Sequence, residues 1–380
     1  MTTASTIPNL KILHVLTLIG QNGEYGGPVR VARELCTELS ERGHSTQILS
    51  GSLEKSEPRR HEGVSETYVT VKPASKKFAV SSLWSWRLLP QIRREIRKAD
   101  VVHIHFARDL IPLLTALIAL MSKKPYITQT HGMILSDYRL STRIIDRVLT
   151  RPLINKSRSI LVLTETESSL IKELDIKSQV RVFPNGIAQY QPEYLGQKPF
   201  GRIAFCSRLD KRKGVLKFIE LAESFKSTGL HFEIYGPDGG ELKLILNEIK
   251  SRNLADSIEY KGALPARKVQ PMLEAIDLLV LPSRDEPFPM IILEALAVGT
   301  SVLVMPSCGF ADNLRVFESN FVAETEDFSG LISAFKKQYQ DKFSSKSQTE
   351  IAQFCRNTFG MNSLIDQLEN IYMQAIKDAK

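Results

Sequence analysis

Short apolar runs alternate with segments of helical periodicity along the whole chain. Residues 11–19 (KILHVLTLI) form the first apolar run, and a glycine-rich turn follows it. Residues 28–44 then place Val29, Ala32 and Leu35 on one helical face, with Pro28 near the start and Gly43 at the end. Strands that alternate with helices in this way predict βαβ units and parallel sheets.

The same alternation recurs after a polar interruption at residues 189–200 (QYQPEYLGQKPF), which reads as a linker. It predicts an N-terminal domain at residues 1–190, a C-terminal domain at 191–362 and a helix at 363–380 that packs back on the first domain. The fold class is α/β, with two doubly wound, Rossmann-like domains facing a central cleft. Ligands of such sheets bind at the carboxyl ends of the strands, so the cleft is the expected site. Further strands are predicted at residues 45–49, 101–106, 126–130, 160–163, 181–183, 202–206, 232–235, 258–260, 278–281 and 301–304, and further helices at 110–121, 214–227 and 290–298.

The charge of the chain is uneven. The 380 residues carry a formal charge of +8, but residues 1–190 contain 27 Lys+Arg against 17 Asp+Glu, whereas residues 191–380 contain 23 against 25. The basic excess therefore lies in the first half, which favours an anionic partner there. No nucleic-acid recognition motif accompanies it, so nucleic acid is not expected.

Several classes of protein are disfavoured. The four cysteines are far apart, with no CxxC, which is typical of core residues in a reducing compartment. His103 and His105 form a pair with no third ligand nearby, so no metal site is expected. The N-terminus has no signal-peptide pattern, and the longest apolar run, residues 110–121, is too short to span a bilayer and reads as a buried helix. We expect a cytoplasmic protein whose membrane contact, if any, is peripheral at the inner membrane face.

The clearest chemical signal is the pair Glu286 and Glu294, separated by seven residues. Glu286 precedes the predicted helix at 290–298 and Glu294 lies one turn into it. Two carboxylates so placed can accept hydrogen bonds from sugar hydroxyls, with the helix N-terminus between them open to phosphate. The alternative is that glutamate near a helix start is favoured by the helix dipole alone.

A second signal is the segment SRLDKRKG, residues 207–214, between a strand and a helix. Arg208 and Lys213 in this segment can converge on one anion, and a diphosphate carries the charge that such a pair neutralises. The alternative is a solvated basic turn.

The order and spacing of these motifs resemble family 4 of the retaining glycosyltransferases, which have the GT-B fold, and in particular its cell-surface polysaccharide type. Arg208-Leu209 and Lys213-Gly214, followed by Glu286-x7-Glu294, carry most of the resemblance. Weaker motifs in the expected order are Gly26-Gly27-Pro28, Thr130-His131-Gly132, Pro184-Asn185-Gly186-Ile187, Tyr235-Gly236-Pro237 and Pro282-Ser283.

The resemblance implies roles for individual residues. Arg208 and Lys213 would stabilise the departing diphosphate in place of a metal, Glu286 would hold hydroxyls of the donor sugar, and His131 would reach the sugar near the reacting carbon; these four are the expected catalytic residues. The other expected donor-binding residues are Gly26, Gly27, Asn185, Gly236, Phe288, Met290 and Glu294, the last at the ribose. Without the resemblance, His131 reads as a hydrogen-bonded histidine at a strand end, and His103 and His105 carry little functional weight.

Some positions depart from the family pattern. Pro287 and Pro289 flank Phe288 where glycines are common, and Pro289 has no N–H to donate, although Phe288 and Met290 do. Ala188 and Asp312 also differ from the usual residues. These changes bear on the identity of the donor rather than on the reaction class.

The most basic and aromatic stretch of the chain contains both tryptophans, and it predicts contact with an anionic membrane surface or an acceptor. The alternative is a solvated helix with the tryptophans in the core. The residues of this patch are Lys76, Lys77, Trp84, Trp86, Arg93, Arg94, Arg97 and Lys98.

The sequence thus predicts a retaining hexosyltransferase that needs neither metal nor cofactor. It would move a hexose from a nucleotide diphosphate sugar to a hydroxyl of a glycan, by resemblance a lipid-linked one in cell-surface polysaccharide synthesis. Two alternatives stay open: a glycosyltransferase or epimerase acting on a soluble sugar, and a nucleotide-sugar-binding subunit without turnover.

Overall fold

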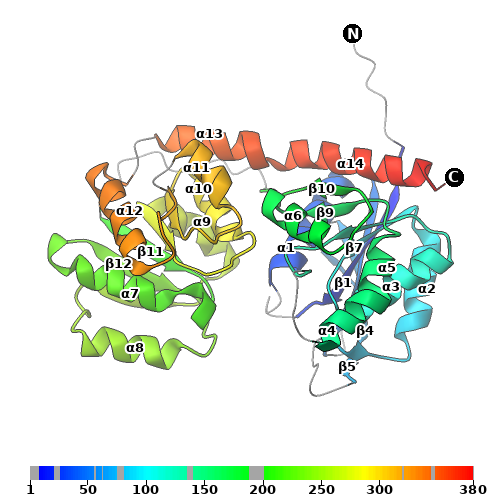
Figure 1. Ribbon diagram of the computed structural model, residues 1–380, viewed down its shortest axis with the longest axis horizontal. Helices are drawn as coiled ribbons and strands as arrows, with labels where there is room; N and C mark the ends of the chain where they lie inside the picture. The colour runs from blue at the N-terminus through cyan, green and yellow to red at the C-terminus, as the bar shows by residue number, and fades with distance from the viewer. Residues whose placement is uncertain are drawn as a thin grey trace, which may run out of the picture. The chain divides into compact units, whose positions relative to one another are not determined.

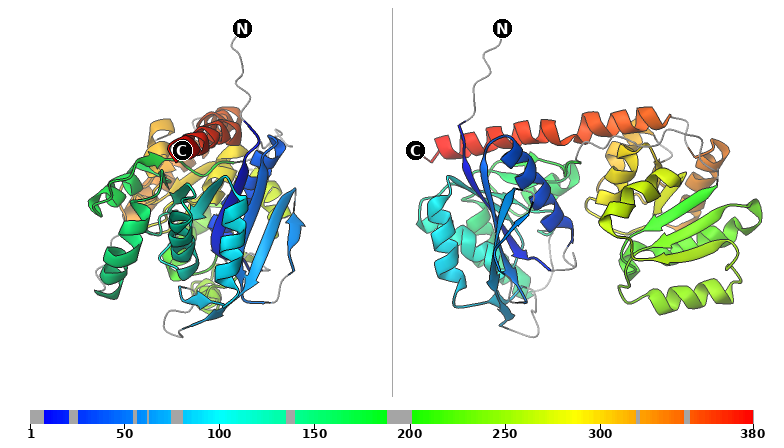
Figure 2. Two further views of the ribbon diagram at one scale, coloured as in Figure 1. Left: turned by 90° about the vertical axis from the view of Figure 1, so that its right-hand side faces the viewer. Right: turned by 180° about the vertical axis from the view of Figure 1, so that it is seen from behind.

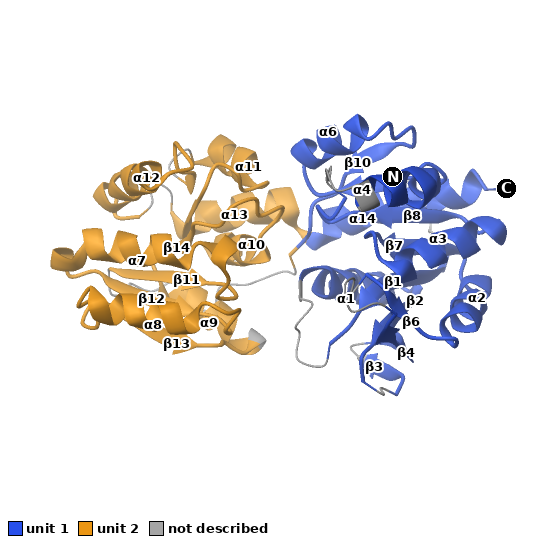
Figure 3. Cartoon of the chain, turned by 60° about the horizontal axis from the view of Figure 1, so that its bottom comes forward, with its two compact units in different colours: residues 1–186, 361–380 blue, residues 187–360 orange. Residues whose placement is uncertain are grey.

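The computed structural model describes residues 8–20, 26–54, 57–61, 63–74, 81–134, 140–187, 201–318, 321–343 and 347–379. They form two compact units (Figure 3): unit 1 holds residues 1–186 and 361–380, and unit 2 holds residues 187–360. The predicted linker at 189–200 lies outside the described residues.

Unit 1 is built on a sheet with the strand order β10-β9-β8-β7-β1-β2-β4-β3. All its neighbouring strands run parallel except β3 and β4, which are antiparallel. The strands are β1 (Lys11–Leu18), β2 (Ser45–Ser52), β3 (Arg59–His61), β4 (Val64–Thr70), β7 (Val101–His105), β8 (Tyr126–Gln129), β9 (Ile160–Val162) and β10 (Val180–Val182), and β5 (Lys72–Pro73) pairs with β6 (Leu83–Trp84) separately.

Helices cover both faces of this sheet (Figure 1). One face packs in a core that includes Leu13 and Val15 of β1, Ile104 of β7 and Ile111 of the following helix. The helices of unit 1 are α1 (Gly26–Glu41), α2 (Leu88–Lys98), α3 (Leu110–Met121), α4 (Leu140–Ile145), the π-helix η2 (Asp146–Thr150), α5 (Arg151–Ile154), α6 (Glu165–Glu173) and α14 (Met361–Lys377).

The C-terminal helix α14 packs back on unit 1, as the sequence predicts (Figure 2). The guanidinium group of Arg42 at the end of α1 binds the carboxylates of Asp366 and Glu369 of α14. Glu369 also accepts a hydrogen bond from His44 at 3.0 Å, and Tyr372 is fully buried against the sheet. These contacts attach α14 to the same face of the sheet as α1.

Unit 2 has a parallel sheet with the strand order β13-β12-β11-β14-β15. Its strands are β11 (Arg202–Cys206), β12 (His231–Tyr235), β13 (Ile258–Gly262), β14 (Leu278–Leu281) and β15 (Ser301–Val304). Its helices are the 3₁₀ turns η3 (Lys211–Lys213) and η4 (Lys226–Thr228), and α7 (Val215–Ser224), α8 (Leu242–Ser251), α9 (Ala266–Ala275), α10 (Met290–Ala297), α11 (Ala311–Phe317), α12 (Phe328–Gln340) and α13 (Gln348–Phe359).

The α/β class, the parallel sheets and the two Rossmann-like units are confirmed. Three details differ from the sequence prediction. The segment before α2 contains strands β3 to β6, which the pattern of apolar runs did not predict. The helix expected at 214–227 begins at Val215, because Gly214 is left-handed with φ of +75°. The helix α3 matches the predicted residues 110–121, yet its Leu117, Leu120 and Met121 are exposed rather than buried.

Candidate functional site

The predicted donor residues of unit 2 follow three neighbouring strands. Arg208 follows β11, Gly236 follows β12 and Glu286 follows β14. These strands are parallel and adjacent in the sheet, so their carboxyl ends meet at one edge. The sheet therefore gathers the three motifs, which are up to 78 residues apart in sequence, in one region.

Lys213 and Glu286 form an ion pair at this edge, between Nζ and Oε2. Their side chains are 16% and 19% exposed, so each is accessible to a ligand while it is held by the other. The pair joins the second half of the basic turn to the loop before α10. Two motifs that the sequence treats separately are thus in direct contact.

Arg208 is paired within its own turn. Its Nε lies 3.1 Å from Oδ2 of Asp210, and its side chain is about half exposed. Asp210 also accepts a hydrogen bond from the amide of Arg212 at 3.0 Å, which caps the 3₁₀ turn η3. Because one carboxylate orders both the arginine and the turn, Arg208 presents a partly exposed guanidinium group in a fixed loop.

Close backbone approach explains two glycines of this region. Gly236 has φ of +148°, and a Cβ there would lie 1.8 Å from the carbonyl oxygen of Ser207. A Cβ at Gly214 would lie 2.1 Å from the carbonyl oxygen of Pro282. Packing inside unit 2 therefore accounts for glycine at 236, whether or not it also contacts a donor.

The loop that carries Glu286 is held by its backbone. The amide of Gly309 donates to the carbonyl oxygen of Glu286 at 2.8 Å, and the amide of Asp285 donates to Oγ of Ser307 at 3.1 Å. Phe288 is buried, in edge-to-face contact with Phe310 at 5.1 Å. The side chain of Phe288 is thus a core anchor, which leaves only its backbone for the donor role expected of it.

The helix α10 begins at Met290, directly after Pro289. The first amides of a helix have no partner within the helix, and the dipole makes this end attractive to anions. Glu294 lies one turn in, as predicted, and is 5% exposed. Burial and the Glu294 charge raise the pKa of the Cys206 thiol to about 12, which places that carboxylate near the end of β11.

In unit 1 the glycine motif forms the first turn of α1, which begins at Gly26. A Cβ at Gly27 would meet nothing within 4 Å, so packing in the described part of the chain does not require glycine there. The open space and the first-turn amides, which have no partner within the helix, suit a ligand that approaches the backbone closely.

His131 follows β8 and has φ of +50°, in the left-handed region. The loop is tied down by Glu167 of α6, which sequence reasoning missed. This buried carboxylate accepts hydrogen bonds from the amide of Gly132 at 2.7 Å, from Oγ1 of Thr130 at 2.5 Å and from the amide of Leu163 at 2.8 Å. The spacing Thr164-x-x-Glu167, a helix-start pattern, was the available signal.

Asn185 lies at the end of unit 1 and is 5% exposed. The adjacent Gly186 is crowded by α14, since a Cβ there would lie 2.8 Å from a methyl carbon of Leu364 and 2.9 Å from the sulfur of Met361. The turn is therefore packed beneath the C-terminal helix. Within the described residues, the buried Oδ1 of Asn185 has no hydrogen-bond partner.

The expectation that His103 and His105 lack a third nearby nitrogen ligand is wrong. His14 of β1 is the register partner of His103, and ligand atoms of the three imidazoles lie within 4.8 Å of one another. The sequence separation of about ninety residues hid this neighbour. His105 in turn contacts His131, with Nδ1 and Nε2 2.7 Å apart.

The basic stretch of unit 1 is exposed as far as the structure describes it; Lys76 and Lys77 lie outside the described residues. Trp86 is 72% exposed, with the guanidinium carbon of Arg87 5.0 Å from its ring centroid. The alternative that places both tryptophans in the core is therefore wrong. Two of the four basic residues of α2, Arg94 and Lys98, bind the buried Glu95 at 2.9 and 2.8 Å, and the remaining two are Arg93 and Arg97.

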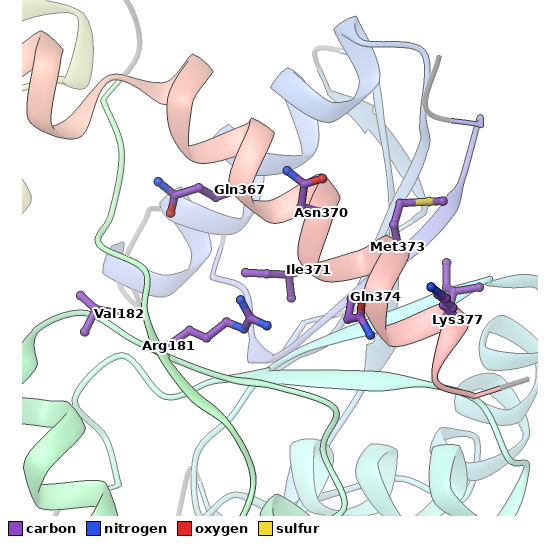
Figure 4. Close-up of a pocket in the computed structure, with 9 residues that line it drawn as sticks. Arg181, Val182, Gln367, Asn370, Ile371, Met373, Gln374 and Lys377 are labelled. Atoms are coloured by element: carbon purple, nitrogen blue, oxygen red, sulfur yellow. The ribbon is translucent and has the colours of Figure 1, made fainter. Parts of the chain in front are cut away.

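A cavity of about 870 Å³ opens between β10 and α14 (Figure 4). Arg181 and Val182 of β10 line it on one side, and amide and aliphatic side chains of α14 line it on the other. None of the predicted site residues contributes to it. This cavity is thus a different place from the motifs of the sequence.

Comparison with known proteins adds the family. Two parallel α/β units that each carry their motifs at strand ends define the GT-B class of fold. Residues 25–189 match the model of Glycosyltransferase Family 4, and residues 189–357 match that of Glycosyl transferases group 1. Together the two models cover residues 25–357, and the chain belongs to the GT-B glycosyltransferases.

Similar proteins fall in the same class. The chain is 26% identical to the 2-deoxystreptamine N-acetyl-D-glucosaminyltransferase of Streptomyces fradiae over 63% of each chain. It is 23% identical to the GDP-mannose:cellobiosyl-diphosphopolyprenol alpha-mannosyltransferase of Xanthomonas campestris, over 63% of this chain and 62% of the relative. The chain thus spans less than two thirds of the length of these two relatives. The crystal structure of Anabaena HepE in complex with UDP-glucose shares the fold, with a TM-score of 0.72, 15% identity and coverage of 95% of this chain and 99% of that one.

Proposed function

We propose that this chain is a retaining, metal-independent hexosyltransferase that takes its sugar from a nucleoside diphosphate donor. The observation that carries the proposal is the Lys213–Glu286 ion pair at the carboxyl edge of the unit 2 sheet, beside the start of α10. A cation for the diphosphate and a carboxylate for sugar hydroxyls are held against each other there. The complex of Anabaena HepE with UDP-glucose supports the donor class.

The chemistry follows from these groups. The bond between the anomeric carbon and the diphosphate oxygen breaks, and the diphosphate leaves with the electron pair. Lys213 and Arg208 offset the charge that develops on it, as preorganised charges do in a transition state. The acceptor hydroxyl bonds to the anomeric carbon on the face from which the diphosphate leaves, and its proton passes to a diphosphate oxygen. The configuration is retained and no enzyme nucleophile is required.

When the donor binds, Lys213 and Glu286 exchange each other for groups of the donor. When diphosphate approaches, Lys213 turns from a carboxylate to phosphate oxygens, and Glu286 is released to accept hydrogen bonds from the sugar. Glu294, buried one turn into α10, is placed for the ribose. The first-turn amides of α10 donate to phosphate.

We propose a lipid-linked glycan of cell-surface polysaccharide synthesis as acceptor. The relative from Xanthomonas campestris is named for a diphosphopolyprenol acceptor, which supports this class. No described helix is long and apolar enough to cross a bilayer, so membrane contact would occur at the surface of unit 1. Most large hydrophobic side chains exposed in the described part of the chain lie between residues 84 and 149, including Trp86, Met121, Ile144 and Val148.

Residues 84–149 also contain more Lys and Arg than Asp and Glu, which favours an anionic bilayer on the inner face of the membrane. The exposed aliphatic residues of α4 and η2 alternate with Arg143 and Arg147, and α2 adds Arg93 and Arg97. Co-sedimentation with vesicles of anionic and of zwitterionic lipid tests the contact. We expect binding to anionic vesicles that weakens at high salt.

A matched pair of variants sharpens the vesicle test. Replacing Ile144 and Val148 by serine should reduce binding, whereas the same change at Leu244 and Leu246, exposed on α8 of unit 2, should not. If vesicle binding changes neither with salt nor with the substitutions at Ile144 and Val148, the proposed membrane contact is wrong. The proposed sugar transfer would not be affected by that result.

The reaction class is tested with the purified chain and a panel of nucleoside diphosphate sugars without acceptor. A transferase hydrolyses its own donor slowly, and NMR of the released sugar shows whether the anomeric configuration is retained. A binding subunit without turnover releases nothing. An epimerase, or an enzyme with a soluble acceptor, instead gives a new sugar or disaccharide without any lipid present.

A further inference from the structure

The cavity between β10 and α14 lies within unit 1 and has room for an organic ligand (Figure 4). Its volume of about 870 Å³ falls in the range of small-molecule pockets, about 300–1,000 Å³. In the order of the described sheet β10 is the last strand, so one wall of the cavity comes from a sheet edge and the other from the C-terminal helix. A ligand in this cavity contacts two segments that are far apart in the sequence.

Two cations line the cavity from its opposite walls. Arg181 comes from β10, and Lys377 comes from the last turn of α14. None of the residues that line the cavity in the described part of the chain is acidic, and neither cation has a carboxylate partner there. Two like charges without a counter-charge attract an anionic ligand.

The acidic residues next to the cavity are engaged elsewhere. Asp366 and Glu369 of α14 bind Arg42 at the end of α1. Asp378, directly after α14, accepts a hydrogen bond from the side-chain amide of Gln374 at 2.6 Å. These carboxylates are therefore held by other partners and leave the two cations of the cavity to a ligand.

The guanidinium group of Arg181 has an unused donor. One terminal nitrogen donates to Oε1 of Gln179 at 2.8 Å, whereas Nε is buried and has no hydrogen-bond partner within the described residues. Figure 4 shows the group directed from β10 toward Ile371 of α14. A buried N–H of a cation is costly without an acceptor, and a carboxylate or phosphate oxygen of a ligand is a suitable one.

Three amide side chains of α14 line the same cavity, at Gln367, Asn370 and Gln374. Their spacing of three and four residues places them along one side of the helix. Asn370 donates to the carbonyl oxygen of Asp366 at 2.9 Å, and Gln374 donates to Asp378. Each of these two amides keeps its oxygen and a second N–H, so it can both accept and donate, as sugar hydroxyls do.

We propose that this cavity binds an acidic oligosaccharide. The two cations hold its acidic groups, the amide side chains exchange hydrogen bonds with its hydroxyls, and Val182 and Ile371 pack on apolar faces of the sugar rings. Because the walls come from β10 and α14, the bound ligand bridges the sheet and the C-terminal helix. None of these residues belongs to the donor motifs of unit 2, so the proposal does not depend on the proposed function.

The test uses NMR of the full-length protein with ¹³C-labelled methionine methyl groups. Met373 lines the cavity, whereas Met290 begins α10 beside the donor motifs, so the two methyl signals report on the two places separately. Met373→Leu and Met290→Leu assign the signals. We expect trigalacturonate, an oligosaccharide of uronic acids, to shift the Met373 signal to saturation, with an affinity that falls at high salt, and to leave the Met290 signal unchanged.

Two matched probes separate the charge of the ligand from its hydroxyl groups. The methyl ester of trigalacturonate keeps the hydroxyls and has no charge. A capped tri-glutamate peptide keeps the carboxylates and has no hydroxyls. We expect the cavity to bind each of these two probes at least about tenfold more weakly than trigalacturonate, measured at the Met373 signal.

Variants of the lining residues test the same contacts from the side of the protein. Arg181→Gln should weaken trigalacturonate binding about tenfold, because charge-assisted hydrogen bonds are lost. Lys377→Gln should weaken it about threefold, because this lysine is exposed, and Gln374→Leu should have a similar effect through the hydroxyls. Lys243→Gln removes an exposed lysine of α8 in unit 2 and should leave the affinity unchanged. Equal melting temperatures show that the variants are folded.

Three outcomes would overturn the proposal. The first is no saturable shift of the Met373 signal, or a shift of the Met290 signal alone, which would place the binding in unit 2. The second is equal affinity for trigalacturonate and either matched probe. The third is unchanged affinity in folded Arg181→Gln and Lys377→Gln. If trigalacturonate binds as expected but the chain hydrolyses no nucleotide sugar, the proposed function fails alone.

Discussion

The two units share a parallel sheet with helices on both faces, yet they hold their polar groups in opposite ways. Unit 2 places charged pairs, Lys213 with Glu286 and Arg208 with Asp210, in loops at the sheet edge where ligands can reach them. Unit 1 buries imidazoles between the sheet and α14, where His105 contacts both His14 and His131. His103 contacts the hydroxyl of Tyr372.

This difference matches two kinds of task. The Lys213–Glu286 pair is largely buried, so each partner can leave the other only when a ligand charge or hydrogen bond takes its place. A buried cluster of neutral imidazoles cannot exchange partners with water, and it fixes geometry instead. The same fold thus holds charged pairs at the sheet edge of one unit and a buried, hydrogen-bonded cluster of imidazoles in the other.

The largest expected effect on stability comes from comparing alanine substitutions at two glycines. Packing requires Gly236, whereas Gly27 has open space around it. Gly236→Ala should lower the free energy of unfolding by about 3 kcal/mol or more, because the new Cβ would lie 1.8 Å from the carbonyl oxygen of Ser207 at a positive φ. Gly27→Ala should leave it unchanged within about 0.5 kcal/mol.

Urea unfolding measures both variants, and donor hydrolysis adds a second readout. Gly27→Ala should fold normally yet lose turnover if a ligand occupies the open space above that residue. A folded Gly27→Ala variant with full turnover would show that the first turn of α1 does not approach the donor.

Acid should weaken unit 1 through its histidines. Their folded pKa values lie below the ordinary 6.5, to about 3 for His14 and His131, so the unfolded state binds more protons between pH 6.5 and 3. Stability is therefore lost as pH falls below 6.5 and is constant above it, by about 1.4 kcal/mol per pH unit for each such histidine.

Unfolding at pH 7 and pH 5 measures this slope in a range where most carboxylates are still ionised. The slope should be smaller in His14→Gln than in the unmodified protein, because one buried histidine no longer titrates on unfolding. An equal slope in the two proteins would contradict the burial of His14 as a neutral imidazole.

A smaller effect is expected from the carboxylate that fixes the His131 loop. Glu167→Gln exchanges one acceptor oxygen for a donor opposite N–H and O–H groups, and it should cost about 1–2 kcal/mol. Glu165→Gln is the control, because Glu165 lies exposed in the same first turn of α6. Thermal unfolding compares them, and equal melting temperatures would show that Glu167 does not hold the loop.

The sequence predicted the fold where its signals are local. Apolar runs such as residues 202–206 and 278–281 coincide with β11 and β14, because buried parallel strands need unbroken apolar side chains. The strands β3 to β6 were not predicted, since β3, β5 and β6 have only two or three residues and β4 (VSETYVT) is largely polar. The exposure of Leu117, Leu120 and Met121 on α3 was also not predicted, because periodicity cannot distinguish a buried apolar face from a solvent-exposed one.

For the candidate site, the sequence located residues but not their partners. Placing Glu286 before a helix and Lys213 before Gly214 required only local patterns, whereas their ion pair depends on the adjacency of β11 and β14. His14 and Tyr372 could not be linked to His103 by spacing, because register across strands and the return of α14 bring them together. Long-range contacts of this kind are set by the packing of whole elements.

The most direct test compares the turnover of Lys213→Ala with that of Lys211→Ala. It tests the central claim that the positioned cation of Lys213 at the edge of the unit 2 sheet stabilises the departing diphosphate. Both lysines lie in η3, but Lys211 is exposed and has no part in the site. We expect donor hydrolysis to fall by about a hundredfold or more in Lys213→Ala and to stay near that of the unmodified protein in Lys211→Ala. Near-normal turnover in folded Lys213→Ala would contradict it.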